Sequence, residues 1–265
     1  MYDWNMKGIV LAGGTGSRLS PITKGVSKQL LPIYNKPLIY YPIATLMLAG
    51  IREILIITTR HDSSRFKETL ASGEQWGIKI SYDFQDKPLG LAQGILIAEN
   101  FIATDPFALI LGDNLFHGDA LGESLHNVEF KKQAHIFAYE VTESNRYGVI
   151  ELDLSGNPLS IEEKPEFPKS RLAVTGLYFY QNTAIEMAKT LQPSLRGELE
   201  ITDLNKLFLD QHELGVTLLP SGTAWFDAGT FESLYDASAY VKILEERQGR
   251  RIGDPMTIAN DFGWV

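Results

Sequence analysis

The chain has 265 residues, a formal net charge of −9 and no cysteine. Its length suffices for one large domain or two small ones with a substantial core. Without cysteine, neither disulfides nor thiolate metal sites can form, and the acidic balance disfavours a nucleic-acid partner, which requires a basic face. No apolar run approaches the ~20 residues that span a bilayer, and the first residues lack a signal-peptide pattern. We therefore expect a cytoplasmic protein without a membrane partner.

Strand-like and helix-like segments alternate through the first half of the chain. The patterns predict strands at 7–11, 53–58, 78–82 and 107–111, and helices at 38–49, 64–71 and 91–100. The helix at 38–49 has apolar residues at helical spacing and stops before Gly50, a good residue to end a helix. Such alternation predicts an α/β fold, with a mostly parallel sheet covered by helices on both faces.

The second half is richer in short strands. These are predicted at 134–140, 148–152, 159–162 and 174–180, and a turn at 155–158 predicts that two of them form a hairpin. Helices follow at 183–190, 203–212 and 230–248. No linker composition separates the halves, so we expect one continuous mixed sheet in a single domain covering 1–265.

A glycine-rich segment, Gly13-Gly14-Thr15-Gly16-Ser17-Arg18, follows the first predicted strand. Glycines let backbone N–H groups form a concave anion site, and Arg18 adds a forked cation that matches phosphate oxygens. The chain has no P-loop string, and Leu19 stands where a dinucleotide fingerprint needs its third glycine. The segment predicts a polyphosphate site, with an ordinary strand–helix turn as the alternative.

Two aspartates follow strand-like segments. Asp113 comes after the strand at 107–111, and Asp227 follows the apolar residues 224–226. Ligands of open α/β sheets bind beyond the carboxyl ends of the strands. Two carboxylates there could hold Mg²⁺, which takes its other ligands from phosphate and water. Each aspartate could instead be a turn or helix-capping residue.

Three further segments carry polar side chains suited to a small phosphorylated ligand. Lys28, within an apolar string, is either a second cation or a snorkelling side chain. Gln85 could read the edge of a pyrimidine base, because its amide both donates and accepts, or could belong to a simple loop. The carboxylates and lysine at 160–165 could bind a sugar phosphate or form surface ion pairs.

Together these motifs resemble the glucose-1-phosphate thymidylyltransferase family of sugar nucleotidyltransferases. The resemblance covers nearly the whole chain, through segments 13–23, 27–32, 36–42, 88–93, 112–114, 146–149, 162–165, 174–178, 196–203 and 227–230. It implies a Rossmann-like nucleotidyltransferase fold with a β-rich sugar-binding part. It also implies a Mg²⁺-dependent reaction in which dTTP and α-D-glucose 1-phosphate give dTDP-glucose and pyrophosphate.

The resemblance implies a role for each matching position. Nucleotide-binding residues would be Leu11, Gly13, Gly14, Gly16, Ser17, Arg18, Gln29, Gln85, Pro88, Gly90 and Asp113. Sugar-phosphate-binding residues would be Asn114, Tyr147, Gly148, Glu163, Lys164, Val174 and Trp225. Asp113 and Asp227 would bind Mg²⁺, and Arg18, Lys28 and Lys164 would be the catalytic cations. The nucleotide part would cover about 1–130, the sugar-phosphate part 131–229 and a helical end 230–265.

A sugar phosphate is already a nucleophile, so we expect catalysis by alignment and charge neutralisation rather than by a strong base. Two other functions stay open. One is a related enzyme that uses UTP or another sugar 1-phosphate, since one methyl group discriminates only about 10–200-fold. The other is a non-catalytic sensor of sugar nucleotides. We also expect a homo-oligomer, either a dimer or a tetramer.

Overall fold

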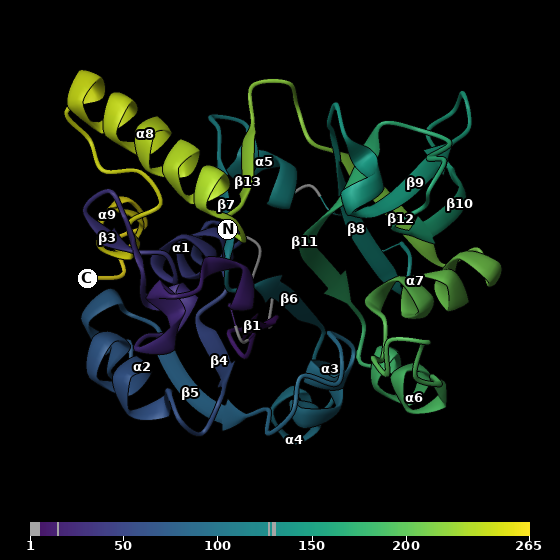
Figure 1. Ribbon diagram of the computed structural model, residues 1–265, viewed down its shortest axis with the longest axis horizontal. Helices are drawn as coiled ribbons and strands as arrows, with labels where there is room; N and C mark the ends of the chain where they lie inside the picture. Colours follow the sequence, from purple (N-terminus) through teal and green to yellow (C-terminus); the bar gives the residue numbers. More distant parts are fainter. Residues whose placement is uncertain (1–5, 15, 127, 129–130) are drawn as a thin grey trace.

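The computed structural model describes residues 6–14, 16–126, 128 and 131–265. Its main sheet contains β1 (Lys7–Leu11), β4 (Glu53–Thr58), β5 (Lys79–Phe84), β6 (Phe107–Leu111), β8 (Ala134–Glu140), β9 (Gly148–Leu152), β10 (Pro158–Glu163), β11 (Leu172–Tyr180) and β12 (Leu214–Leu218). The order is β10-β9-β11-β6-β1-β4-β5, and β8 pairs with both β11 and β12 (Figure 1). In this nine-stranded sheet, β10 and β11 run against the direction shared by the other strands. The predicted mixed, mostly parallel sheet is confirmed.

Helices cover both faces of the sheet, because alternate strand residues point to opposite sides. Val10 of β1 belongs to a core formed with α1 (Tyr40–Leu48), α2 (Ser63–Leu70), α5 (Leu121–His126) and α9 (Pro255–Asp261). Its neighbour Ile9 belongs to a second core, with α3 (Gln93–Ile97), α4 (Glu99–Ile102), α6 (Thr183–Thr190) and α7 (Ile201–Asp210). The strands β1, β4 and β6 are therefore buried on both faces, as their apolar runs predict.

The predicted elements differ from the observed ones in a few places. The segment 91–100, predicted as one helix, is divided between α3 and α4. Ala98 lies between them with ψ of 1°, away from the helical value. The patterns missed β12, α5 and α9, and also β7 (Asn114–His117), which pairs with β13 (Ala224–Asp227) in a separate two-stranded ribbon.

The helix α8 (Phe231–Gln248) packs against both that ribbon and the hairpin of β2 (Pro32–Ile33) and β3 (Lys36–Pro37). A third, smaller core joins the three, formed by residues such as Ile33, Leu115 and Val241. The helix begins where the Thr230 hydroxyl accepts a hydrogen bond from Ser233 N at 3.2 Å, and it ends at a left-handed Gly249. Among the described helices, none has the length and hydropathy needed to cross a bilayer.

Candidate active site

Three parallel strands of the sheet are followed, at their carboxyl ends, by residues that line one cavity. Gly13 and Gly14 lie beyond β1, Gln85 directly follows β5, and Asp113 lies beyond β6. They line a cavity of about 170 Å³ that includes eight of the predicted nucleotide-binding residues and the predicted catalytic Lys28. Its lining residues are Leu11, Gly13, Gly14, Lys28, Gln29, Gln85, Pro88, Gly90, Leu91, Leu111, Asp113 and Glu198.

The loop around Gln85 forms one wall of this cavity, the smaller of two that adjoin each other. The Gln85 amide donates to the carbonyl of Gly90 at 3.2 Å and to Gln93 Oε1 at 2.8 Å, which fixes its orientation. Gly90 has φ of 105°, and a side chain there would collide with the backbone of Leu199. Glycine is therefore needed for the two segments to approach each other.

The glycine loop contains a left-handed residue, Gly16, with φ of 61°. The Thr23 hydroxyl donates to its carbonyl at 2.8 Å. Gly16 and Ser17 line neither this cavity nor a larger one that adjoins it. Thr15 lies outside the described residues. Arg18, in the short 3₁₀ helix at Ser17–Leu19, reaches the larger cavity instead.

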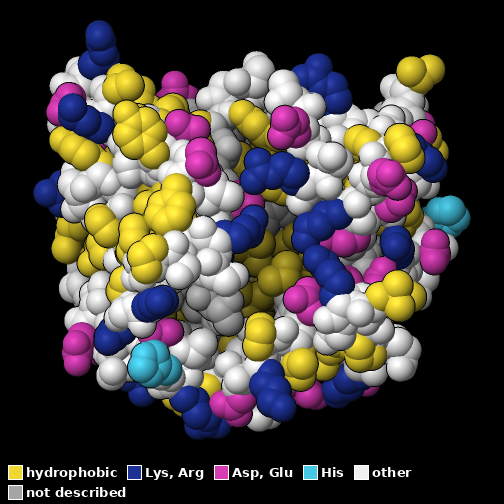
Figure 2. Space-filling view, viewed as in Figure 1, with side chains coloured by type: hydrophobic (Ala, Val, Ile, Leu, Met, Phe, Trp, Pro, Cys, Tyr) yellow, Lys and Arg dark blue, Asp and Glu magenta, His cyan; other side chains and the backbone are white. Residues whose placement is uncertain are grey.

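That larger cavity, of about 570 Å³, adjoins the first. Both are lined by Leu91, Leu111, Asp113 and Glu198. All seven predicted sugar-phosphate-binding residues line the larger cavity, together with Arg18, Asp227 and residues that were not among the predicted site residues: Arg146, Gly176, Tyr178, Arg196, Glu200 and Ile201. Figure 2 shows a hollow in the middle of the molecule, bordered by lysine and arginine side chains.

Asp113 lies where the two cavities meet. Its side chain forms an ion pair with Lys28 Nζ and accepts a hydrogen bond from the amide of Asn114 at 3.1 Å. Burial raises the pKa of the Asp113 carboxyl, but the charge and hydrogen bond of Lys28 outweigh burial, so that the pKa lies below its ordinary value. Asp113 is therefore ionised at neutral pH.

Asp227 comes to the same place from the far end of the chain. It pairs with Asn114 in the β7–β13 ribbon, and the following Ala228 N donates to the carbonyl of Asp113 at 3.0 Å. Burial and the neighbouring charge of Asp113 raise the pKa of Asp227 above its ordinary value, although Lys28 and Arg18 oppose the shift. The two carboxylates are thus close enough to repel each other.

Trp225 and Tyr147, which contact each other, form an aromatic wall of the larger cavity, and Tyr139 packs against Trp225. The ring of Trp225 lies 5.0 Å from that of Tyr147 and 5.8 Å from that of Tyr139, between centroids. A flat apolar surface beside charged groups suits a sugar ring, which has apolar C–H faces and polar edges.

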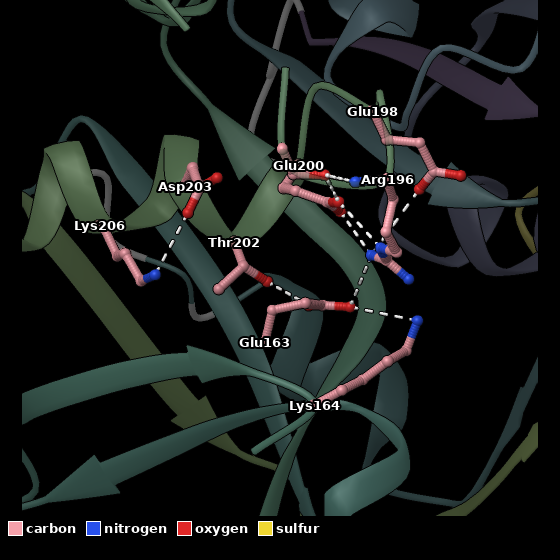
Figure 3. Close-up of polar contacts among 9 residues, drawn as sticks. Glu163, Lys164, Arg196, Glu198, Glu200, Thr202, Asp203 and Lys206 are labelled. Atoms are coloured by element: carbon pink, nitrogen blue, oxygen red, sulfur yellow. Dashed lines mark hydrogen bonds and ion pairs between the residues drawn. The ribbon is translucent and has the colours of Figure 1, made fainter. Parts of the chain in front are cut away.

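Charged residues face one another across the same cavity (Figure 3). Arg196 Nη2 lies 2.8 Å from a Glu200 oxygen and 3.5 Å from Glu163 Oε1, which is also 3.3 Å from Lys164 Nζ. Thr202 donates to the second oxygen of Glu163 at 2.6 Å. Arg196 and Glu200 fall within a segment that carries the family resemblance, but nothing in its pattern distinguishes them from surface residues.

This pair of adjoining cavities occurs in a chain whose residues 7–243 match the nucleotidyl transferase family. The chain belongs to that family. This nucleotidyltransferase is 52% identical to "Glucose-1-phosphate thymidylyltransferase" of Mycolicibacterium smegmatis, over 98% of its own length and 90% of the relative. It is 51% identical to the protein of that name from Xanthomonas campestris, over 98% and 88% of the two chains. The family resemblance that the sequence motifs indicated is confirmed.

Solved structures agree with the nucleotidyltransferase fold. A Bacillus anthracis protein in complex with sucrose, provisionally named glucose-1-phosphate thymidylyltransferase, has a TM-score of 0.82 and 40% identity, covering 89% of this chain and 94% of that one. A UDP-glucose pyrophosphorylase complexed with UDP-glucose has a TM-score of 0.77 and 29% identity, covering 90% and 99%. The fold class predicted from the motifs is confirmed.

Proposed function

We propose that this nucleotidyltransferase transfers a thymidylyl group from dTTP to α-D-glucose 1-phosphate, giving dTDP-glucose and pyrophosphate. The observation that carries the proposal is the pair of cavities that meet at Asp113. The smaller, with Gln85 and the glycine loop, fits a pyrimidine nucleotide, and the larger, with Trp225 and Lys164, fits a sugar phosphate. Identities of 51–52% with the named relatives support the same substrates.

The reaction needs little covalent chemistry from the protein. A phosphate oxygen of the sugar phosphate attacks the α-phosphorus of dTTP, and the bond from that phosphorus to the oxygen bridging it to the β-phosphate breaks. Pyrophosphate leaves with the bonding electrons. Coulomb repulsion between unit charges ~4 Å apart is about 4 kcal/mol at an effective dielectric constant near 20. Fixed cations that offset this repulsion therefore supply much of the catalysis.

Three cationic side chains support this part of the proposal. Lys28 contacts Asp113 at the junction of the cavities, Arg18 lines the larger cavity, and Lys164 extends from the end of β10. Lys164 has φ of 45°, a left-handed conformation that is unfavourable for a lysine. Its backbone N–H donates to the Tyr147 carbonyl at 3.0 Å, which holds it there. We infer that Lys164 binds the phosphate of the sugar phosphate.

We further propose that Asp113 and Asp227 hold Mg²⁺. The fit rests on their mutual repulsion and on the charge of the larger cavity, which five carboxylates and four cationic side chains line. Side chains of this balance cannot by themselves neutralise a triphosphate. The described residues contain no group of three or more metal-ligating side chains, as is usual for Mg²⁺ sites completed by substrate phosphates and water. Bound Mg²⁺ would neutralise charge on the phosphates.

The second candidate is transfer of a uridylyl group, favoured by the likeness to UDP-glucose pyrophosphorylase. A sensor of sugar nucleotides is less consistent with the site, because it would not need the pair of aspartates. Pyrophosphate release, measured with dTTP, UTP and other nucleotides against a panel of sugar 1-phosphates, tests all three. Pyrophosphate release is expected to be fastest with dTTP and glucose 1-phosphate. If no pair of substrates gives any release, the proposed enzymatic function is contradicted. A homo-oligomer and a cytoplasmic location stay predictions.

A further inference from the structure

The cationic side chains of the larger cavity fall into two pairs. Lys164 and Arg196 each contact carboxylates, Glu163 for the lysine and chiefly Glu200 for the arginine (Figure 3). Arg18 and Arg146 form no ion pair with any carboxylate of the described residues. The positive charge of this cavity that no carboxylate pairs with therefore lies at Arg18 and Arg146.

The backbone that carries Arg146 is held in place. The residue ends the 3₁₀ helix Ser144–Arg146. The buried Ser144 hydroxyl donates to the carbonyl of Ser170 at 2.8 Å, and Tyr147 N donates to that of Ser144 at 3.0 Å. The carbonyl of Tyr147 in turn accepts a hydrogen bond from Lys164 N. Arg146 is therefore attached to the wall of the cavity rather than to a free loop.

Arg146 lines the same cavity as Asp227, and a row of aromatic contacts leads from one to the other. Its Cζ is 5.8 Å from the centre of the Tyr147 ring, which itself contacts Trp225. Trp225 and Asp227 are two residues apart on β13, so their side chains share one face of the strand.

Arg18 reaches the same carboxylate from the opposite end of the chain. A Cβ added to Gly229 would lie 3.0 Å from both Arg18 Nη2 and Asp227 Oδ1. The absence of a side chain at Gly229 thus leaves the space that the Arg18 guanidinium occupies. Two arginines without ion-pair partners among the described residues thus line the cavity that also holds Asp227, beside the junction where the α-phosphate would react.

We propose that Arg146, together with Arg18, binds the β- and γ-phosphates of the nucleotide and holds them as pyrophosphate after the reaction. A guanidinium presents a planar fork of donors that matches phosphate oxygens. Arg146 is here a substrate-binding residue, and it lines the cavity that also holds Asp227, a proposed metal ligand, rather than the Gln85 pocket. This inference rests on the proposed nucleotidyl transfer, but not on the identity of the base or sugar.

Pyrophosphorolysis tests the inference, because pyrophosphate is then a substrate whose KM can be measured. With dTDP-glucose and pyrophosphate, Arg146→Ala is expected to raise the KM for pyrophosphate at least about tenfold, and to leave that for dTDP-glucose within about twofold. A hydrogen bond to a charged group is worth about 1.5–3 kcal/mol, and each 1.4 kcal/mol is about tenfold. Arg146→Lys should restore part of the loss, since it keeps the charge but not the fork.

The matched control is Arg171→Ala. Arg171 is an exposed arginine that lies outside both cavities and contacts Glu140 at 3.6 Å, so neither KM should change. An unchanged pyrophosphate KM in Arg146→Ala would overturn the inference. So would a raised KM for dTDP-glucose alone, which would assign Arg146 to the sugar. Calorimetric titration of Arg146→Ala with pyrophosphate and Mg²⁺ must show weaker binding than the wild type.

The test separates this inference from the proposed function. If the wild-type protein prefers another nucleotide or sugar 1-phosphate, the same two KM values are measured with that sugar nucleotide, because pyrophosphate is common to all of them. The proposed specificity then fails while the role of Arg146 is still decided.

Discussion

Asn114 and Trp225 lie 111 positions apart in the chain, and the Trp225 indole donates a hydrogen bond to Asn114 Oδ1 at 2.7 Å. The same oxygen accepts a bond from Gly176 N at 3.1 Å, while the Asn114 amide donates to Asp113. Asn114 is only 1% exposed. One buried amide therefore sets the positions of the aromatic wall, of β11 and of a proposed metal ligand relative to one another.

Replacing Asn114 tests this linkage. Asn114→Ala leaves the Trp225 and Gly176 donors unsatisfied, and an unsatisfied buried group costs about 1–3 kcal/mol. We expect a free energy of unfolding lower by that amount in urea titrations. Asn157→Ala, in the exposed turn between β9 and β10, should stay within about 0.5 kcal/mol of the wild type. Equal urea midpoints for the two variants would show that the linkage does not stabilise the fold.

The proposed metal role of Asp113 predicts a loss of turnover rather than of nucleotide binding. Asp113→Asn keeps the shape of the side chain but removes its charge. Loss of one group that stabilises transition-state charge costs on the order of 10²–10³ in rate, so we expect pyrophosphate release to fall at least about a hundredfold. Affinity for dTTP, measured by calorimetry, should weaken much less. Asp203→Asn on α7, where Asp203 pairs with Lys206, is the control, and full activity of Asp113→Asn in Mg²⁺ would contradict the proposal.

The assignment of Lys164 to the sugar phosphate predicts a change in one substrate only. Lys164→Ala should raise the KM for glucose 1-phosphate about 10–100-fold, the equivalent of about 1.5–3 kcal/mol for a charged hydrogen bond. The KM for dTTP should change little. Steady-state kinetics with each substrate varied will show the difference, and Lys169→Ala, an exposed lysine near Glu151, should match the wild type. A normal KM for glucose 1-phosphate would rule the role out.

A buried ion pair away from the cavities predicts a pH dependence of stability. Glu245 of α8 accepts hydrogen bonds from Lys36 Nζ and Asn35 Nδ2, both at 2.6 Å, and from Ile252 N at 3.1 Å. Burial raises the pKa of Glu245, but these hydrogen bonds and the charge of Lys36 outweigh burial and hold it below its ordinary value.

Because the pKa of Glu245 is lower in the folded chain, its contribution to stability is complete well above the ordinary glutamate pKa of about 4.3. It is lost as the pH falls through the folded value. We expect the free energy of unfolding of the wild type to drop more between pH 6 and pH 3 than that of Glu245→Gln. Urea titrations across this range measure the difference. Parallel curves would show that Glu245 does not titrate with folding.

Much of the fold follows from local patterns. The strands at 7–11, 53–58, 107–111, 134–140 and 148–152 are observed with the predicted bounds, because runs of apolar, often β-branched residues favour buried strands. The placement of Gly13 and Asp113 beyond strand ends follows as well, since it depends only on where a strand stops. The strand β7 and its pairing with β13 were missed, because β7 has only four residues and its periodicity is too short to read.

The sequence by itself determined most of the strands, the glycine loop and the residue types suited to phosphate, because these depend on local patterns along the chain. Only the tertiary structure decided which of them meet. The Lys28–Asp113 pair spans 85 positions and the Trp225–Asn114 bond 111, and Arg196 joins Glu163 across 33. Such contacts form when distant segments pack on a common core, so the charge environment of each carboxylate is a property of the fold and not of its local sequence.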